Sequence, residues 1–224
     1  MKRIIVLMMM SCFLITPPAQ AEDDFQYWSR YSLKMVDTEK VDWTIFAEAR
    51  FYNDTDDLGL YYISQRVSYD LWKHLSLGTN YTYLNYRTQS RDGTLAEDKF
   101  QHRLELEANP KFKWGERITF KNRNRVEFRW IEDKGSYNTR LRHRWTLSYA
   151  LKDKGPVKDV YAESEFIYNI AEHAYDENRT IPIGATFKVN DKMSLKTFYM
   201  IQNKLGATDW YANQIFGTQI SLQF

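Results

Sequence analysis

Residues that build most enzyme and metal sites are scarce in this sequence. Its 224 residues include one cysteine, Cys12, and four histidines that lack the spacing of metal ligands. A single cysteine excludes an intramolecular disulfide. Neither a Gly-x-Ser-x-Gly turn nor a phosphate-binding glycine loop is present. The sequence therefore predicts no catalytic residues, no cofactor and no metal site.

Long apolar runs and an excess of charge are also missing after residue 21. The 31 basic residues include Lys2 and Arg3, so 29 basic residues balance 29 acidic ones in the rest of the chain. That balance argues against nucleic acid as a partner. The aromatic content is high, with 16 Tyr, 13 Phe and 7 Trp. Low mean hydropathy with many aromatics is typical of a membrane β-barrel, in which only alternate residues meet lipid.

Residues 1–21 are predicted to be a secretory signal peptide that is cleaved after Ala21. Lys2 and Arg3 precede a short apolar run, and Ala19-Gln20-Ala21 fits an A-x-A cleavage site. The run is too short for a membrane-spanning helix. Cys12 lies inside the run, so lipidation is disfavoured. The expected protein is exported through the periplasm, and residues 22–224 form one domain.

Residues 117–150 carry the clearest pattern in the chain. Alternate residues are charged, and the residues between them are mainly aromatic or aliphatic. The charged set is Lys121, Arg123, Arg125, Glu127, Arg129, Arg140, Arg142 and Arg144. Period-two alternation predicts two long β-strands. A second sheet would cover the apolar face in a soluble sandwich, whereas lipid would cover it in a transmembrane barrel.

The remaining pattern favours a single antiparallel transmembrane β-barrel. Strand-like segments lie near residues 25–36, 43–52, 59–70, 75–87, 100–109, 117–131, 137–150, 159–170, 179–189, 193–203 and 211–224. The last of these alternates and ends in Phe224, which resembles the C-terminal signature that the barrel-assembly machinery of Gram-negative bacteria reads. Bacterial barrels with both termini in the periplasm have an even number of strands, so ten or twelve are expected.

The hairpin within 117–150 has a predicted register. Folding about residues 133–135 places Glu127 opposite Arg140, Arg125 opposite Arg142, and Arg123 opposite Arg144. Opposed like charges need acids from flanking strands, and Glu105, Glu107, Glu163 and Glu165 are available. Arg50, Arg66, Arg103 and Glu48 extend the same face. These side chains either form a salt-bridge lattice that closes the interior or line a basic passage for anions.

Some residues complicate this pattern. Asn122, Asn124 and His143 fall on the lipid face, which a register slip or bulge would explain; the functional alternative is a lateral contact with another subunit or lipopolysaccharide.

Ile181, Ile183 and Phe187 are all predicted to face lipid. The acidic clusters at 54–57 and 172–177 are predicted to be solvated loops.

Three stretches resemble a known family. They are Asp24-Phe-Gln-Tyr-Trp28, the stretch 69–78 with Tyr81 and Tyr83, and Asn122-Arg-Asn-Arg-Val-Glu-Phe-Arg129. They are similar to uncharacterised proteins that are catalogued as a domain of unknown function. Those proteins have about 200 residues, which is the length of a single domain. The resemblance implies a barrel in the bacterial outer membrane, surrounded by lipid and lipopolysaccharide. In size and basic lumen the chain also resembles the oligogalacturonate and sialic-acid porins, without a shared motif.

Three functions follow as expectations. The first is a narrow channel for small hydrophilic, including anionic, solutes. The second is a closed structural or adhesive barrel that acts through its loops or partners. The third is a lipid-modifying enzyme, for which His102 would pair with Ser90 or Ser136.

Overall fold

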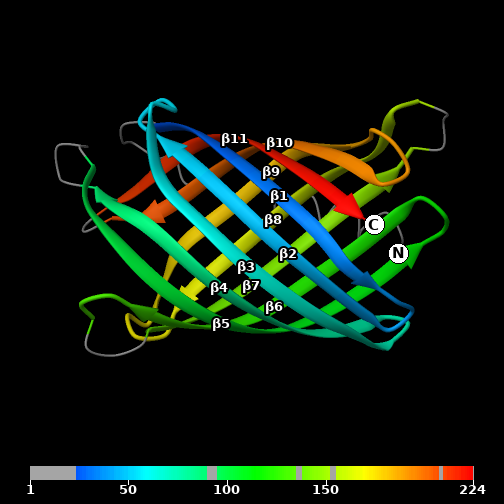
Figure 1. The fold of residues 1–224 in the computed structure, drawn as a ribbon, viewed down its shortest axis with the longest axis horizontal. Coiled ribbons are helices and arrows are strands. Elements are labelled where there is room, and N and C mark those ends of the chain that lie inside the picture. The colour runs from blue at the N-terminus through cyan, green and yellow to red at the C-terminus, as the bar shows by residue number, and fades with distance from the viewer. Residues whose placement is uncertain (1–23, 90–94, 135–137, 152–154, 207–208, 224) are drawn as a thin grey trace, which may run out of the picture.

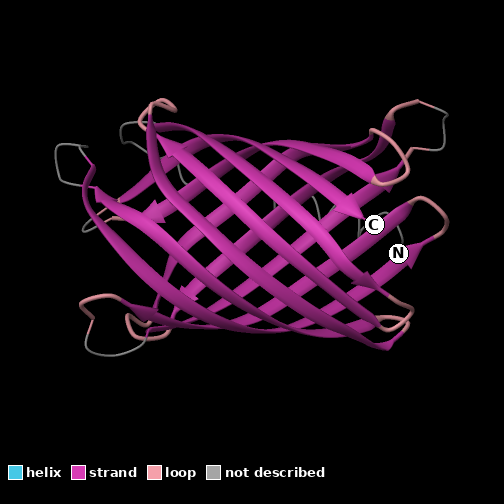
Figure 2. Cartoon of the chain, in the orientation of Figure 1, coloured by secondary structure: helices cyan, strands magenta, loops and turns pink. Residues whose placement is uncertain are grey.

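The computed structural model describes residues 24–89, 95–134, 138–151, 155–206 and 209–223. They form one closed β-barrel of eleven strands (Figures 1 and 2). None of the described residues forms a helix long and apolar enough to cross a membrane. The strands are β1 (Asp24–Asp37), β2 (Val41–Tyr52), β3 (Asp57–Trp72), β4 (Leu75–Gln89), β5 (Leu95–Trp114), β6 (Ile118–Ile131), β7 (Asn138–Ala150), β8 (Val157–Asn169), β9 (Ala174–Lys188), β10 (Met193–Leu205) and β11 (Trp210–Gln223).

The first and last strands close the barrel as a parallel pair. β1 lies beside β11 from Asp24 opposite Asn213 to Lys34 opposite Gln223, and every other neighbouring pair is antiparallel. The eleven segments read from the sequence are therefore confirmed as strands, and only the expectation of an even number, ten or twelve, was wrong. Ten antiparallel steps separate β1 from β11, and an even number of reversals leaves these two strands pointing the same way, so their pairing must be parallel. Asp24, where β1 begins, and Gln223, where β11 ends, consequently lie at opposite ends of the barrel. Figure 1 shows β1 and β11 side by side.

The connections alternate between the two ends of the barrel. At one end β1 is followed by β2, β3 by β4, β5 by β6, β7 by β8 and β9 by β10, and we call it the turn end. At the other end β2 is followed by β3, β4 by β5, β6 by β7, β8 by β9 and β10 by β11, and we call it the loop end.

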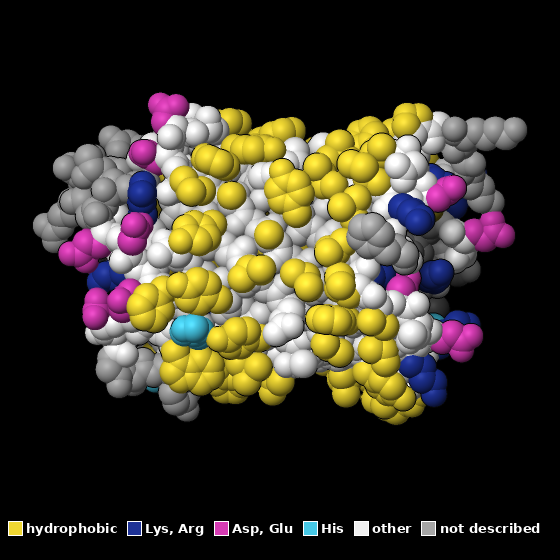
Figure 3. All heavy atoms as spheres, in the orientation of Figure 1, with side chains coloured by type: hydrophobic (Ala, Val, Ile, Leu, Met, Phe, Trp, Pro, Cys, Tyr) yellow, Lys and Arg dark blue, Asp and Glu magenta, His cyan; other side chains and the backbone are white. Residues whose placement is uncertain are grey.

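The outer surface is apolar around the middle of the barrel. Figure 3 shows hydrophobic side chains over the middle of the visible face and charged side chains gathered near both ends. Ile63, Tyr81, Leu106 and Phe216 all point outward and are exposed. This is the arrangement expected where lipid contacts alternate residues of each strand.

Ile181 departs from the predicted alternation. It is 6% exposed and faces the interior, whereas Ile183 faces outward and is 64% exposed. The register of β9 shifts beside both neighbouring strands at this point. Pro182 lies at the shift, and proline is tolerated at such bulges because it has no N–H to donate. The extra residue reverses the phase, so the prediction that Ile181 faces lipid was wrong.

Part of the interior is packed with apolar side chains. Trp28, Ile181, Met200 and Ile215 form a buried cluster, with Tyr161 and Phe198 against it. The ring of Phe198 lies over Gly217, where a Cβ atom would overlap it. Tyr161 covers Gly184 in the same way. Glycine thus makes room for aromatic rings inside the wall.

Candidate functional site

The charged hairpin of β6 and β7 has the register that its sequence predicted. Glu127 is opposite Arg140, Arg125 opposite Arg142, and Arg123 opposite Arg144. No register shift interrupts this pair of strands. The alternating pattern therefore places the whole charged set on the interior face.

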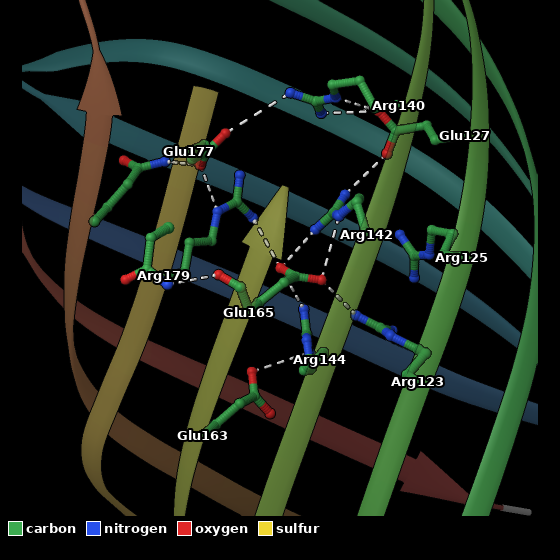
Figure 4. Close-up of polar contacts among 12 residues, drawn as sticks. Arg123, Arg125, Glu127, Arg140, Arg142, Arg144, Glu163, Glu165, Glu177 and Arg179 are labelled. Atoms are coloured by element: carbon green, nitrogen blue, oxygen red, sulfur yellow. Dashed lines mark hydrogen bonds and ion pairs between the residues drawn. The ribbon is translucent and has the colours of Figure 1, made fainter. Parts of the chain in front are cut away.

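Two carboxylates organise the lattice around this hairpin (Figure 4). Glu127 accepts from Arg140 at 2.8 Å and from Arg142 at 2.9 Å. Glu165 accepts from Arg142 at 2.8 Å and from Arg144 at 3.1 Å. Both side chains are almost fully buried, with Glu127 0% and Glu165 1% exposed. Arg142 thus joins two acids from different strands.

The other predicted acids also pair with hairpin arginines. Arg125 lies 2.9 Å from Glu105 and 2.6 Å from Glu107 on β5. Arg144 lies 3.1 Å from Glu163 on β8. Flanking strands therefore supply the acids that neutralise the opposed arginines, because burying like charges without partners would destabilise the sheet.

Sequence reasoning missed a second part of the lattice. Glu177 was predicted to lie in a solvated loop, but β9 begins at Ala174 and Glu177 is 6% exposed in the interior. Its carboxylate accepts from Arg179 at 2.6 Å and from Gln202. Across the barrel, Glu48 and Arg50, which were predicted to face the interior, pair at 2.7 Å, and Glu48 also pairs with Arg30, which was not predicted. Period-two alternation along β1 would have placed Arg30 on the interior face, whereas the register shifts of β9 hid Arg179 from the same reasoning.

A small central cavity lies inside this lattice. Its volume is about 80 Å³. Nine arginines and one carboxylate, that of Glu105, are among its lining residues. The arginines are Arg30, Arg50, Arg66, Arg103, Arg123, Arg125, Arg142, Arg144 and Arg179. Because most paired carboxylates are not part of the lining, the surface that a solute would meet is strongly basic.

Larger cavities lie on both sides of the central one. Toward the turn end, a cavity of about 610 Å³ is lined by several lysines and by Asp159 and Glu163. Its lysines are Lys111, Lys113, Lys121, Lys158 and Lys196. At the loop end, a cavity of about 280 Å³ has mixed charge from Arg129, Lys134, Asp176 and Lys204. The predicted interior residues that line a cavity therefore divide between the central one and these two larger cavities, which we call vestibules. Glu48, Glu107, Glu127, Arg140 and Glu165 line none of the three and are buried in their ion pairs.

Asn122, Asn124 and His143 lie together on the outer face. His143 Nδ1 is 2.7 Å from Asn124 Oδ1, and Asn124 donates to Asn122 at 2.6 Å. Asn122 is 3.3 Å from His143 Nε2, which closes a ring of contacts. Since no shift interrupts the β6–β7 register, the bulge that the sequence favoured as an explanation is wrong. The lateral contact stays a prediction.

The remaining candidate chemistry finds little support among the described residues. No group of three or more His, Cys, Asp or Glu side chains there could hold a metal ion. His102 lies on the outer face, with its Nδ1 2.7 Å from the Tyr81 hydroxyl. Ser90 and Ser136, its predicted partners, lie outside the described residues.

Comparison with solved structures supports an outer-membrane-type β-barrel. The crystal structure of the β-domain of a Bordetella autotransporter superposes with a TM-score of 0.51 at 12% sequence identity. The match covers 81% of this chain and 83% of the autotransporter chain. At that identity the likeness concerns the fold alone.

Comparison with sequences gives the family. No curated protein matches the chain. A family model described as a protein of unknown function, DUF2490, matches residues 25–213. The match spans most of the barrel, from β1 into β11. The chain therefore belongs to the DUF2490 family.

Proposed function

We propose that this protein is a narrow channel of the bacterial outer membrane that passes small anions. The observation that carries the proposal is the central cavity, which nine arginines and a single glutamate line. Desolvated cations concentrated around a constriction attract anions and repel cations, because the surrounding wall screens charge poorly. Rings of Arg or Lys side chains are a known basis of anion selectivity in pores.

The dimensions of the cavity limit what could pass. A volume of about 80 Å³ holds only a few water molecules at about 30 Å³ each. Small inorganic anions fit this space, whereas sugars and oligosaccharides would require the lattice to rearrange. We therefore narrow the expected solutes to small anions.

The turn-end vestibule supports the same direction of selectivity. Five lysines line it with two acids, Asp159 and Glu163, beside them. Anions would be concentrated there before they reach the arginines, an effect that weakens as salt screens the charges. The loop-end vestibule has both signs of charge and would contribute less.

Conductance of the folded protein in planar lipid bilayers tests the proposal. In a KCl gradient, the reversal potential should have the sign that chloride selectivity gives. Replacing Lys121 and Lys196 by glutamine should reduce the selectivity. Arg87→Gln is the matched control, because Arg87 pairs with Asp98 on the exposed surface and lines none of the three cavities.

The main alternative is a closed barrel that acts through its loops or partners. The observation that favours it is the density of buried ion pairs, which leaves little open volume at the centre. The same bilayer experiment separates the two functions. Protein that is folded and inserted, as judged by heat-modifiable mobility, but that never conducts would reject the channel and leave the closed barrel.

A further inference from the structure

We infer that Arg66, Arg103 and Arg123 form a binding site for a small divalent oxyanion, such as phosphate or sulfate, at the central cavity. The inference rests on the proposed function in one respect, since the anion must be able to enter the lumen. It goes further by assigning a ligand class and three residues.

Six of the nine arginines of the cavity are held by close carboxylates. Arg50 lies 2.7 Å from Glu48, and Arg179 lies 2.6 Å from Glu177. Arg125, Arg142 and Arg144 each lie within 3.1 Å of two acids, and Arg30 pairs with Glu48. These six are fixed parts of the lattice.

The other three arginines are farther from any described carboxylate. Arg66 reaches Asp42 at 3.9 Å, and Arg103 reaches Glu127 at 3.9 Å. Arg123 lies 3.6 Å from Glu165, an acid that Arg142 and Arg144 already engage at shorter distance. They belong to β3, β5 and β6 and line one cavity. Three weakly compensated cations in a confined space favour a multivalent counter-ion.

Unsatisfied hydrogen-bond donors on one of these three arginines, Arg66, and on two neighbours in the cavity lining give a second indication. The Nε atoms of Arg66, Arg125 and Arg144 are buried and have no hydrogen-bond partner among the described residues. All three side chains line the cavity. Buried N–H groups are rarely left without an acceptor. An oxyanion offers several acceptors at once, and the planar guanidinium fork matches its geometry.

The carboxylate in the cavity lining does not occupy the site. Glu105 is held by Arg125 at 2.9 Å and accepts from Asn80 at 2.6 Å. Both partners keep it engaged among β4, β5 and β6. The cavity of about 80 Å³ then offers room for a tetrahedral oxyanion but not for an organic solute of sugar size.

Equilibrium dialysis of labelled phosphate against the folded barrel in detergent tests the site. We expect saturable binding to the unmodified protein, competed by sulfate but not by gluconate at equal ionic strength. Arg103→Gln and Arg123→Gln should each weaken binding about tenfold or more, because each removes a charged donor. Arg87→Gln, on the exposed surface, should bind as the unmodified protein does. Absent binding, or equal binding in all variants, would overturn the site.

Two further measurements keep the result interpretable. Heat-modifiable mobility checks that each variant is folded, and Arg66→Gln provides a third variant if either of the others does not fold. In planar bilayers, phosphate should block chloride current in the unmodified protein and much less in Arg103→Gln. Phosphate binding without any current would support the site and reject the channel. Current that phosphate never affects, in protein that does not bind it, would support the channel and reject the site.

Discussion

Arg142 and Glu165 meet across β7 and β8 with a nitrogen-to-oxygen distance of 2.8 Å, and both side chains are nearly inaccessible. The same carboxylate also accepts from Arg144 at 3.1 Å and lies 3.6 Å from Arg123. Arg179 on β9 lies 3.9 Å from it, so one acid serves four arginines on three strands. Its loss would leave positive charges facing one another in a confined space.

Glu165→Gln should destabilise the barrel strongly. Removing one partner of a buried ion pair typically costs about 3–5 kcal/mol, because the charge left behind is uncompensated. Urea unfolding in lipid vesicles measures the effect as a lower midpoint. Asp98→Asn is the matched control, since Asp98 forms an exposed pair with Arg87 and such pairs contribute about 0–1 kcal/mol. Equal shifts of the unfolding midpoint in the two variants would contradict the inference that Glu165 holds the ion-pair lattice together.

Gly217→Val should destabilise the barrel for a steric reason. A Cβ at Gly217 would overlap the ring of Phe198, so the ring must leave its packed position. Overpacking of this kind costs about 1–3 kcal/mol. Gly155→Ala provides a control, because no atom lies within 4 Å of a Cβ at that position. A Gly217→Val protein with an unchanged unfolding midpoint would show that the ring has somewhere else to go.

Spin labels at Ile181 and Ile183 should report opposite environments. In liposomes, a label attached to Ile183→Cys should be accessible to lipid-dissolved oxygen, since Ile183 is 64% exposed on the outer face. A label on Ile181→Cys should be shielded from it, because Ile181 packs with Trp28 and Met200. Equal accessibility at both positions would mean that the bulge at Pro182 does not reverse the strand.

A lateral contact at Asn122, Asn124 and His143 can be tested by cross-linking. We propose that this polar group on the outer face meets another subunit, since polar groups are costly in contact with lipid. His143→Cys should then give a disulfide-linked dimer in native membranes. Tyr31→Cys is the control, because Tyr31 is exposed on β1, five strands away around the barrel. Monomers from both variants would leave the polar group without a protein partner.

Much of the wall could be predicted from the sequence, because each strand carries its own alternation. The register of β6 with β7 followed from one short connection and the charge pattern. The four acids that neutralise this hairpin also lie on adjacent strands, Glu105 and Glu107 on β5 and Glu163 and Glu165 on β8. All of this depends on local periodicity and on neighbouring strands.

Other features required information that no local pattern holds. The acidic cluster at 172–177 looked like a loop, yet Glu177 is buried because Arg140, Arg179 and Gln202 surround it. The alternation of β9 also did not show that the chain bulges at Pro182 and changes phase there. The alternation marked all eleven strands, but the rule of an even strand number argued against that count, because the parallel pairing of β1 with β11 leaves no mark on either strand.

The parallel seam between β1 and β11 has a consequence for assembly. It joins residues as far apart as Ser32 and Ser221, which are 189 positions apart and share a hydrogen bond. Such a closure cannot form until the last strand is in place, and contacts this distant in sequence form slowly. Parallel pairing is also slightly weaker per residue than antiparallel pairing. The seam is thus where a nascent barrel stays open longest, and where a finished one would part most readily into a sheet with two free edges.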